Sequence, residues 1–170
     1  MKIKNPLTRE RKTIGMSVSD DADFLSKYSE IGKPVISEEV ADFLENAAKA
    51  FHPDQSFTLD IKSECIDEAE KPRYHEAIKN HYDLKLSEIE RELKRKTFVS
   101  VLFTAIGVIA LAVMFILSAL HVGEIWTECV DIFAWVFLWE AVDQFFIERS
   151  GLLMKSKRYK NFTEMQVDFI

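Results

Sequence analysis

Residues 97–120 form a run of 24 residues without a single charged side chain. A helix needs roughly 20 predominantly apolar residues to cross about 30 Å of hydrocarbon. A buried helix of a soluble protein is the alternative, but such helices seldom stay apolar on every face for this length. We therefore expect residues 97–120 to form a membrane span.

The sequence around this run is charged and mixed in sign. The first 96 residues contain 17 Lys and Arg and 20 Asp and Glu. The N-terminal segment MKIKNPLTRERK lacks the apolar core of a signal peptide, so insertion would depend on internal segments. The net charge of -6 gives no general attraction to nucleic acid. Cys65 and Cys129 lie in segments of different character, which argues against a disulfide.

A second apolar segment, residues 125–147, carries four carboxylates at Glu128, Asp131, Glu140 and Asp143. The connection at residues 121–124 is short and contains no Lys or Arg, whereas basic residues precede the first segment and follow the second. The positive-inside rule then predicts a transmembrane helical hairpin with both termini in the cytoplasm. The alternative is an amphipathic helix lying flat on the outer surface.

Helical periodicity places the four acids together with Trp135 and Trp139 on one broad face. The opposite face is apolar: Ala134, Phe137, Leu138, Ala141 and Phe145. A carboxylate in a span costs roughly 2.5–3.5 kcal/mol at the centre unless it meets water or a partner. The apolar face can contact lipid or the first span, whereas contact with lipid is unfavourable for the face that carries the acids.

Two interpretations of the acids stay open. In one, the acids extend to the headgroups and the Trp side chains form an interfacial belt. In the other, several copies surround a water-lined path with acidic vestibules and a constriction at the two Trp residues, and acidic rings favour cations. The predicted pore-lining residues are Glu128, Asp131, Trp135, Trp139, Glu140 and Asp143.

The soluble part before the span predicts two helices. Acids after Ser19 indicate a short helix to about Ile31, ended by Gly32. A second helix begins after Ser37 and closes at about His52. Its predicted apolar face is Val40, Phe43, Leu44, Ala47, Ala48 and Phe51.

Alternating apolar and polar residues predict strands at residues 57–61 and 165–169, and more weakly at residues 12–18. We expect the C-terminal strand to return after the hairpin and pair with the strand near Phe57. Two strands alone are marginal, so a third strand or a neighbouring protomer is required.

The apolar positions of residues 72–93 recur every three or four residues, and no Pro or Gly interrupts the chain from there to Gly107. Residues 72–120 are therefore predicted as one long helix, which would carry a cytoplasmic rearrangement into the membrane. A hinge near Thr97 between two helices is the alternative.

The sequence contains none of the common catalytic, nucleotide-binding or metal-binding motifs. The four histidines are spaced unlike metal ligands. We expect no enzyme activity, no cofactor and no metal.

Two basic clusters flank the spans, and each has two compatible explanations. They set the topology and contact anionic headgroups, or they bind a phosphate-bearing ligand such as a nucleotide or a short single strand, with an aromatic ring for stacking. The residues are Arg91, Lys94, Arg95, Lys96, Lys155, Lys157, Arg158, Tyr159 and Lys160.

The stretch WEAVDQFFIER at residues 139–149, followed by Arg158, Tyr159 and Phe162, resembles small bacterial two-span membrane proteins. The layout of a compact sensor joined to a short hairpin also resembles Hailong-type antiphage channel effectors. That resemblance implies a gated pore, controlled by a nucleotide or DNA oligomer, in a defence system with a partner encoded in the same operon.

These observations predict a mainly α membrane protein with a small cytoplasmic α+β unit and a long helix running into the first span. The predicted parts are an α+β unit (1–71), a stalk helix (72–96), a hairpin (97–148) and a basic segment with a C-terminal strand (149–170). We expect a homo-oligomeric, cation-preferring channel in the bacterial inner membrane, in contact with lipid and assembled as a ring. The alternative is a membrane-anchored adaptor that binds a partner protein.

Overall fold

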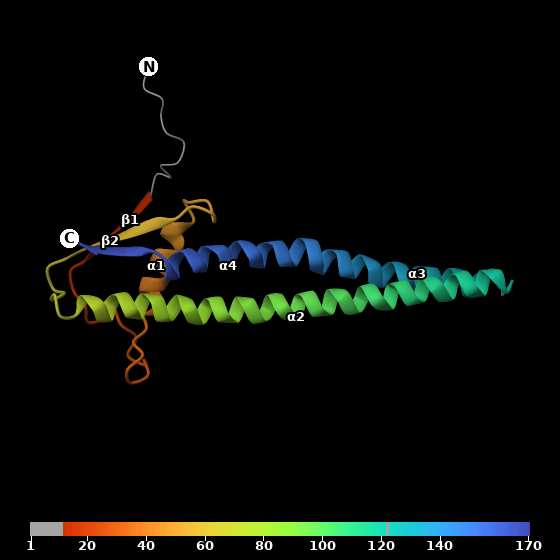
Figure 1. Ribbon diagram of the computed structural model, residues 1–170, viewed down its shortest axis with the longest axis horizontal. Coiled ribbons are helices and arrows are strands. Elements are labelled where there is room, and N and C mark those ends of the chain that lie inside the picture. The colour runs from red at the N-terminus through yellow and green to blue at the C-terminus, as the bar shows by residue number, and fades with distance from the viewer. Residues whose placement is uncertain (1–11, 122) are drawn as a thin grey trace, which may run out of the picture. The chain divides into compact units, whose positions relative to one another are not determined.

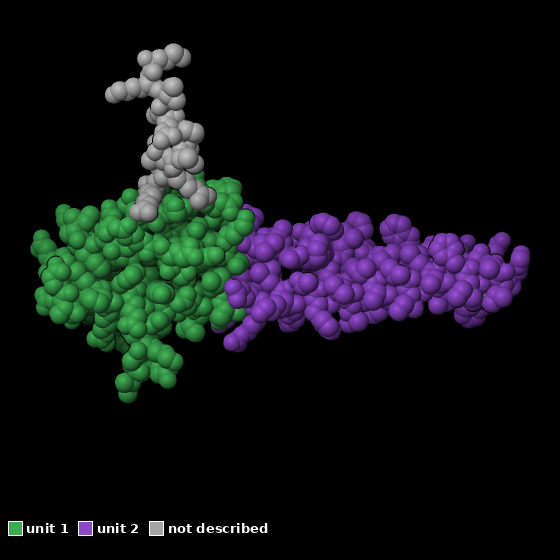
Figure 2. Space-filling model, in the orientation of Figure 1, with its two compact units in different colours: residues 1–87, 155–170 green, residues 88–154 purple. Residues whose placement is uncertain are grey.

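The computed structural model describes residues 12–121 and 123–170, so the predictions for the N-terminal segment lie mostly outside the described residues. The chain is mostly helical and has one small sheet (Figure 1). Its elements are β1 (Lys12–Val18), α1 (Glu38–Ala48), β2 (Phe57–Ser63), α2 (Lys71–Ala119), α3 (Glu124–Val142), the π-helical stretch η1 (Asp143–Glu148), α4 (Arg149–Thr163) and β3 (Gln166–Phe169). Residues 1–87 and 155–170 form unit 1, and residues 88–154 form unit 2 (Figure 2).

The sheet of unit 1 has three parallel strands in the order β1-β2-β3. Leu59 in the central strand lies opposite Ile14 on one side and Val167 on the other. The predicted pairing of the C-terminal strand with the strand near Phe57 is confirmed, and residues 12–18 supply the third strand. Parallel strands need a crossover connection. Along the chain, α1 belongs to the connection from β1 to β2, and the connection from β2 to β3 contains the whole of unit 2.

The core of unit 1 forms where one face of the sheet meets helical residues. Phe57, Leu59 and Ile61 alternate with more exposed residues along β2 and are at most 4% exposed. Tyr82 of α2 stacks on Phe162 of α4 with ring centroids 4.1 Å apart. The C-terminal end of α4 is thereby packed into the core of the same unit as the N-terminal part of α2.

The predicted helix at residues 19–31 is wrong. The Asp20 carboxylate accepts a hydrogen bond of 3.0 Å from the Ala22 amide, and Leu25 forms an antiparallel bridge with Ile36. Ser and Asp side chains that bond to nearby backbone stabilise turns in competition with helix. Gly32, with a φ of 82°, belongs to a tight turn instead of a helix end.

The predicted helix after Ser37 is confirmed as α1. The Ser37 side chain caps it by accepting a hydrogen bond from the Val40 amide. Its buried residues are Ala41, Leu44 and Ala48. Phe43, predicted on the buried face, is 44% exposed. The small Ala41 faces the core in its place, because the buried stripe is rotated by part of a turn from the predicted one.

Helix α2 has 49 residues without a break, so the single long helix is confirmed and the hinge near Thr97 is absent. Among the described residues, α2 is the helix with the length and apolar composition of a membrane span. Helix α3 has 19 residues and carries carboxylates at Glu128, Asp131 and Glu140, whereas the apolar part of α2 carries no charged side chain.

The segment after the second apolar stretch is also helical. The predicted basic segment forms the helix α4, which together with η1 continues the helix of α3 to Thr163, and the predicted C-terminal strand follows as β3. Directly after α2, His121 adopts a left-handed conformation with φ of 52°, which is typical of a helix end.

Candidate functional site

The α2 and α3 helices of unit 2 pack together at small residues. Ala134 is fully buried, and Gly107 approaches it so closely that a Cβ added to the glycine would lie 3.4 Å from the Ala134 carbonyl oxygen. The same Cβ would lie 2.7 Å from Leu138 side-chain atoms. Small residues let membrane helices approach closely. The prediction that the apolar face of the second segment can meet the first helix is confirmed at these positions.

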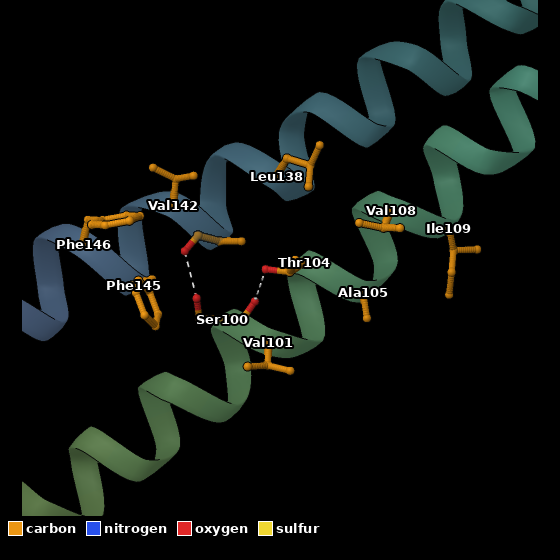
Figure 3. A pocket seen from close by; sticks show the side chains of 11 residues that line it. Ser100, Val101, Thr104, Ala105, Val108, Ile109, Leu138, Val142, Phe145 and Phe146 are labelled. Atoms are coloured by element: carbon orange, nitrogen blue, oxygen red, sulfur yellow. Dashed lines mark hydrogen bonds between the residues drawn. The ribbon is translucent and has the colours of Figure 1, made fainter.

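A buried hydrogen bond crosses the same contact. The Ser100 hydroxyl on α2 is 2% exposed and donates to the Ala141 carbonyl oxygen of α3 at 2.9 Å (Figure 3). At other levels of the hairpin, Phe103 packs edge-on against Phe137 with centroids 5.5 Å apart. These contacts fix the rotation of α3 about its own axis, and therefore fix which side chains it leaves exposed.

The acid–Trp face of α3 and η1 consists of the six predicted pore-lining residues. Glu128, Trp135, Trp139 and Glu140 are exposed, and Asp131 and Asp143 are half-buried. Trp135 and Trp139 are 61% and 68% exposed. A single chain thus leaves all six side chains open at least in part, since the packing with α2 uses the opposite face.

The π-helical stretch Asp143–Glu148 changes the face downstream of Glu140. The Gln144 side chain donates to a Glu140 carboxylate oxygen at 2.9 Å. A π turn shifts the following side chains relative to a regular helix. Phe145, predicted on the apolar face that can contact lipid or the first helix, is 38% exposed, and the Arg149 guanidinium lies 4.8 Å from its ring centre. Phe145 nevertheless lines an apolar groove together with Ser100 of α2, as expected for a residue of the apolar face (Figure 3).

An apolar groove of about 890 Å³ opens beside the helix contact in unit 2 (Figure 3). Ser100, Val101 and Thr104 line it from α2, and Val142 and Phe146 line it from α3 and η1. The Thr104 hydroxyl bonds to the carbonyl oxygen of Ser100 in its own helix, which leaves the groove wall apolar.

The first basic cluster belongs to α2 within unit 2. Arg91, Lys94 and Arg95 are exposed. Lys96 forms an ion pair with Glu148 of η1 and is thereby part of the hairpin contact. Three of the four predicted cations of this cluster remain accessible to a headgroup or an anionic ligand.

The second cluster belongs to α4 within unit 1. Lys157 pairs with Asp54 at 2.8 Å, and Lys160 lies 3.7 Å from Glu164. Lys155 is exposed, and Arg158 is half-buried. Exposed pairs of this kind are weak, so both lysines can exchange these partners for other anions.

Tyr159 lies in a network centred on Glu45 of α1. One Glu45 oxygen is 2.9 Å from the Lys85 ammonium of α2, and the other is 3.4 Å from the Tyr159 hydroxyl. Burial raises the pKa of the Tyr159 phenol, and the Glu45 charge raises it further. Burial alone would lower the pKa of Lys85, but the hydrogen bond and charge of Glu45 outweigh it and raise that pKa. The network joins α1, α2 and α4 inside unit 1.

The Tyr159 ring packs against this core, 5.9 Å from the Tyr82 ring. Among the described residues, no three His, Cys, Asp or Glu side chains come together in a group that could hold a metal ion.

Sequence reasoning missed the residues that orient the site. Ser100 and Gly107 are seven residues apart in a run of large apolar side chains, and this spacing of small residues on one helix face was the available signal. The ion pair of Lys96 with Glu148 had no comparable signal, because its partners are 52 residues apart in the chain.

No family model, curated protein or solved structure matches the chain.

Proposed function

We propose that the protein is a homo-oligomeric, gated membrane channel that prefers cations, with both termini in the bacterial cytoplasm. The observation that carries the proposal is the rotation of α3 about its own axis, which decides the side chains that face α2 and those that stay exposed. Its apolar side contacts α2 through Ala134 and Ala141, which are at most 4% exposed, while the acid–Trp face stays open. In a bilayer, carboxylates on that face need water, and several hairpins around a common axis would provide it.

The order of side chains along the acid–Trp face suits a conduction path. Asp131 and Glu140 bracket Trp135 and Trp139, with no other charge between the two acids. Rings of carboxylates concentrate cations, and a ring of large apolar side chains can close a pore by excluding water. In this proposal, the Trp residues form the gate and the acids set the preference for cations.

Unit 1 offers a means of gating. Its core holds the start of α2 through Tyr82 and the end of α4 through Phe162. Glu45 binds side chains from both helices. A ligand that changes these contacts would alter how the two helices leave unit 1, and α2 continues from there without a break into the apolar segment.

The basic residues guide the choice of ligands to test. Arg91, Lys94, Arg95 and Lys155 are exposed, and they suit phosphate groups of lipid, nucleotide or single-stranded DNA. The similarity of layout to Hailong-type effectors favours a role in antiphage defence, and nucleotides and DNA oligomers are the first ligands to add.

Bilayer recordings of purified protein test the proposal. We expect cation-selective currents in the wild type, and a reduced cation preference in Asp131→Asn with Glu140→Gln. Glu88→Gln, an exposed acid of α2 outside the apolar run, is the matched control and should conduct as the wild type does.

A membrane-anchored adaptor makes the opposite prediction. It would pass no current in any condition, and its cellular activity would survive replacement of the spans by an unrelated hairpin. Unchanged conductance and selectivity in the double variant would also contradict the proposed path.

A further inference from the structure

Unit 1 has a braced loop, residues 26–33, that projects from its surface (orange in Figure 1). The Ser26 amide donates to the Val35 carbonyl at 2.9 Å where the two arms of the loop meet. The Ser29 hydroxyl donates to the Ser26 carbonyl at 2.9 Å and accepts from the Val35 amide at 3.2 Å. Asn80 of α2 donates to the Pro34 carbonyl at 3.0 Å. These bonds hold the loop in one shape against the body of the unit.

The loop carries two large apolar side chains that touch almost nothing in their own chain. Tyr28 is 96% exposed and Ile31 is 102% exposed. Single exposed apolar residues are common on surfaces. Two of them at the end of a hydrogen-bonded projection can bind another surface. Because the hydrogen bonds already hold the loop in one shape, burying these side chains would cost little conformational entropy.

A second feature of unit 1 has the complementary character. A hollow of about 420 Å³ lies where β1 ends and α1 begins. Val18, Val40 and Phe43 contribute apolar surface, and Asp20, Asp23 and Glu39 contribute carboxylates; the lining contains no Lys or Arg, although Asp23 pairs with Lys27 of the neighbouring loop. The volume is sufficient for one or two side chains, and the exposed Phe43 forms part of its wall.

Charge also matches between the loop and the hollow. Residues 26–33 contain Lys27, Lys33 and one acid, Glu30, so the loop is net positive and the hollow is negative. Lys27 and Lys33 pair with Asp23 and Glu30 at 3.0 and 3.7 Å, with every one of these side chains at least 75% exposed. Such pairs are weak, so the lysines can turn to carboxylates of another chain.

We propose that Tyr28 and Ile31 of one copy insert into the β1–α1 hollow of the next copy around a ring. The inference rests on the proposed channel. Copies that share one orientation in a membrane are related by an axis along the membrane normal, and a ring of more than two then needs heterologous contacts. A projection and a hollow formed by different residues of one unit are such a pair, although they are neighbours in the chain. Two side chains fall short of the roughly 800 Å² per partner of a standard interface, so this contact sets the register of an assembly that the hairpins also hold.

Disulfide trapping in the full-length chain tests the contact. Cys65→Ser and Cys129→Ser remove the native thiols, and Tyr28→Cys with Phe43→Cys adds a pair that meets only between copies in the proposed ring. Oxidation in detergent should give a ladder of covalent multimers that ends at one closed species. The control pairs Tyr28→Cys with Lys49→Cys, an exposed position at the far end of the same helix α1, and should give no ladder.

A second variant separates assembly from folding. Tyr28→Ser with Ile31→Ser changes only exposed side chains, so the melting temperature of unit 1 should stay unchanged while association weakens about tenfold or more. An absent ladder, a ladder equally strong in the control pair, or a double-serine variant that assembles as the wild type does would overturn the proposal. A crosslink to an unrelated protein in place of a second copy would overturn it too. Currents without the ladder would refute this contact alone, and the ladder without currents would refute the channel alone.

Discussion

Gly107→Ala should weaken the packing of the α2–α3 hairpin. The new Cβ would lie 2.7 Å from Cγ and Cδ2 of Leu138, a separation that real Cβ atoms do not show. Overpacking of this kind costs about 1–3 kcal/mol. The higher helix propensity of alanine offsets about 1 kcal/mol of it. The difference between the overpacking cost and the helix-propensity gain is a net loss of up to about 2 kcal/mol in the free energy of unfolding.

A double-mutant cycle with Leu138→Ala isolates the clash from the propensity. In the Leu138→Ala background the two contacts of 2.7 Å are gone and the contact of 3.4 Å with the Ala134 carbonyl oxygen remains, so Gly107→Ala should become close to neutral or stabilising. The coupling free energy should then equal the clash, about 1–3 kcal/mol. The assay is reversible unfolding in detergent micelles, followed by circular dichroism. Gly151→Ala is the matched control, because a Cβ there meets nothing within 4 Å.

Additive effects of Gly107→Ala and Leu138→Ala, within about 0.5 kcal/mol, would refute the close contact between these helices. So would a Gly107→Ala variant that is as stabilised as Gly151→Ala. Either result would also remove the reason for the orientation of the acid–Trp face.

Two further predictions concern single side chains. Ser100→Ala removes the buried hydrogen bond to Ala141 and should lower stability by about 1 kcal/mol, whereas Ser118→Ala on the exposed surface of the same helix should change it little; equal effects would contradict the bond. Burial lowers the pKa of His81 below its ordinary value of 6.5, so the unfolded chain binds the proton more readily and stability should fall as pH drops below about 6.5. Thermal melts from pH 7.5 to 5 should show that loss in the wild type and a smaller one in His81→Gln, and parallel curves would contradict the buried imidazole.

Much of the secondary structure follows from local sequence. Ser37 followed by Glu38 and Glu39 predicts the start of α1, and the alternation around Leu59 predicts β2, because capping and one-sided burial leave direct traces in residue order. The long helix α2 follows from the absence of Pro and Gly before Gly107. The turns at residues 19–31 were missed, since Asp20 can cap a helix or close a turn with the same carboxylate.

The candidate site was predicted in part. Periodicity grouped Asp131 and Glu140 with the Trp residues, because a regular helix fixes their angular positions. The π-helical stretch breaks that regularity after Val142, so the angular positions of the side chains that follow it cannot be derived from a period of 3.6 residues. The Glu45 network brings together residues 40 and 114 positions apart, and no local pattern encodes such pairings.

In the proposed channel, water reaches the acid–Trp face inside the membrane. Thiol accessibility measures this directly in membrane vesicles. Single cysteines are placed at Asp131, Glu140, Ala134 or Ala141 in a chain whose own cysteines are replaced by serine, and a charged, membrane-impermeant thiol reagent is added from each side.

We predict that cysteines replacing Asp131 and Glu140 react with the reagent, and that those replacing the buried Ala134 and Ala141 do not. The reaction at position 131 or 140 should also block current in bilayers. If positions 131 and 140 are as protected as 134 and 141, the acids face lipid or dry protein and the proposed water path does not exist.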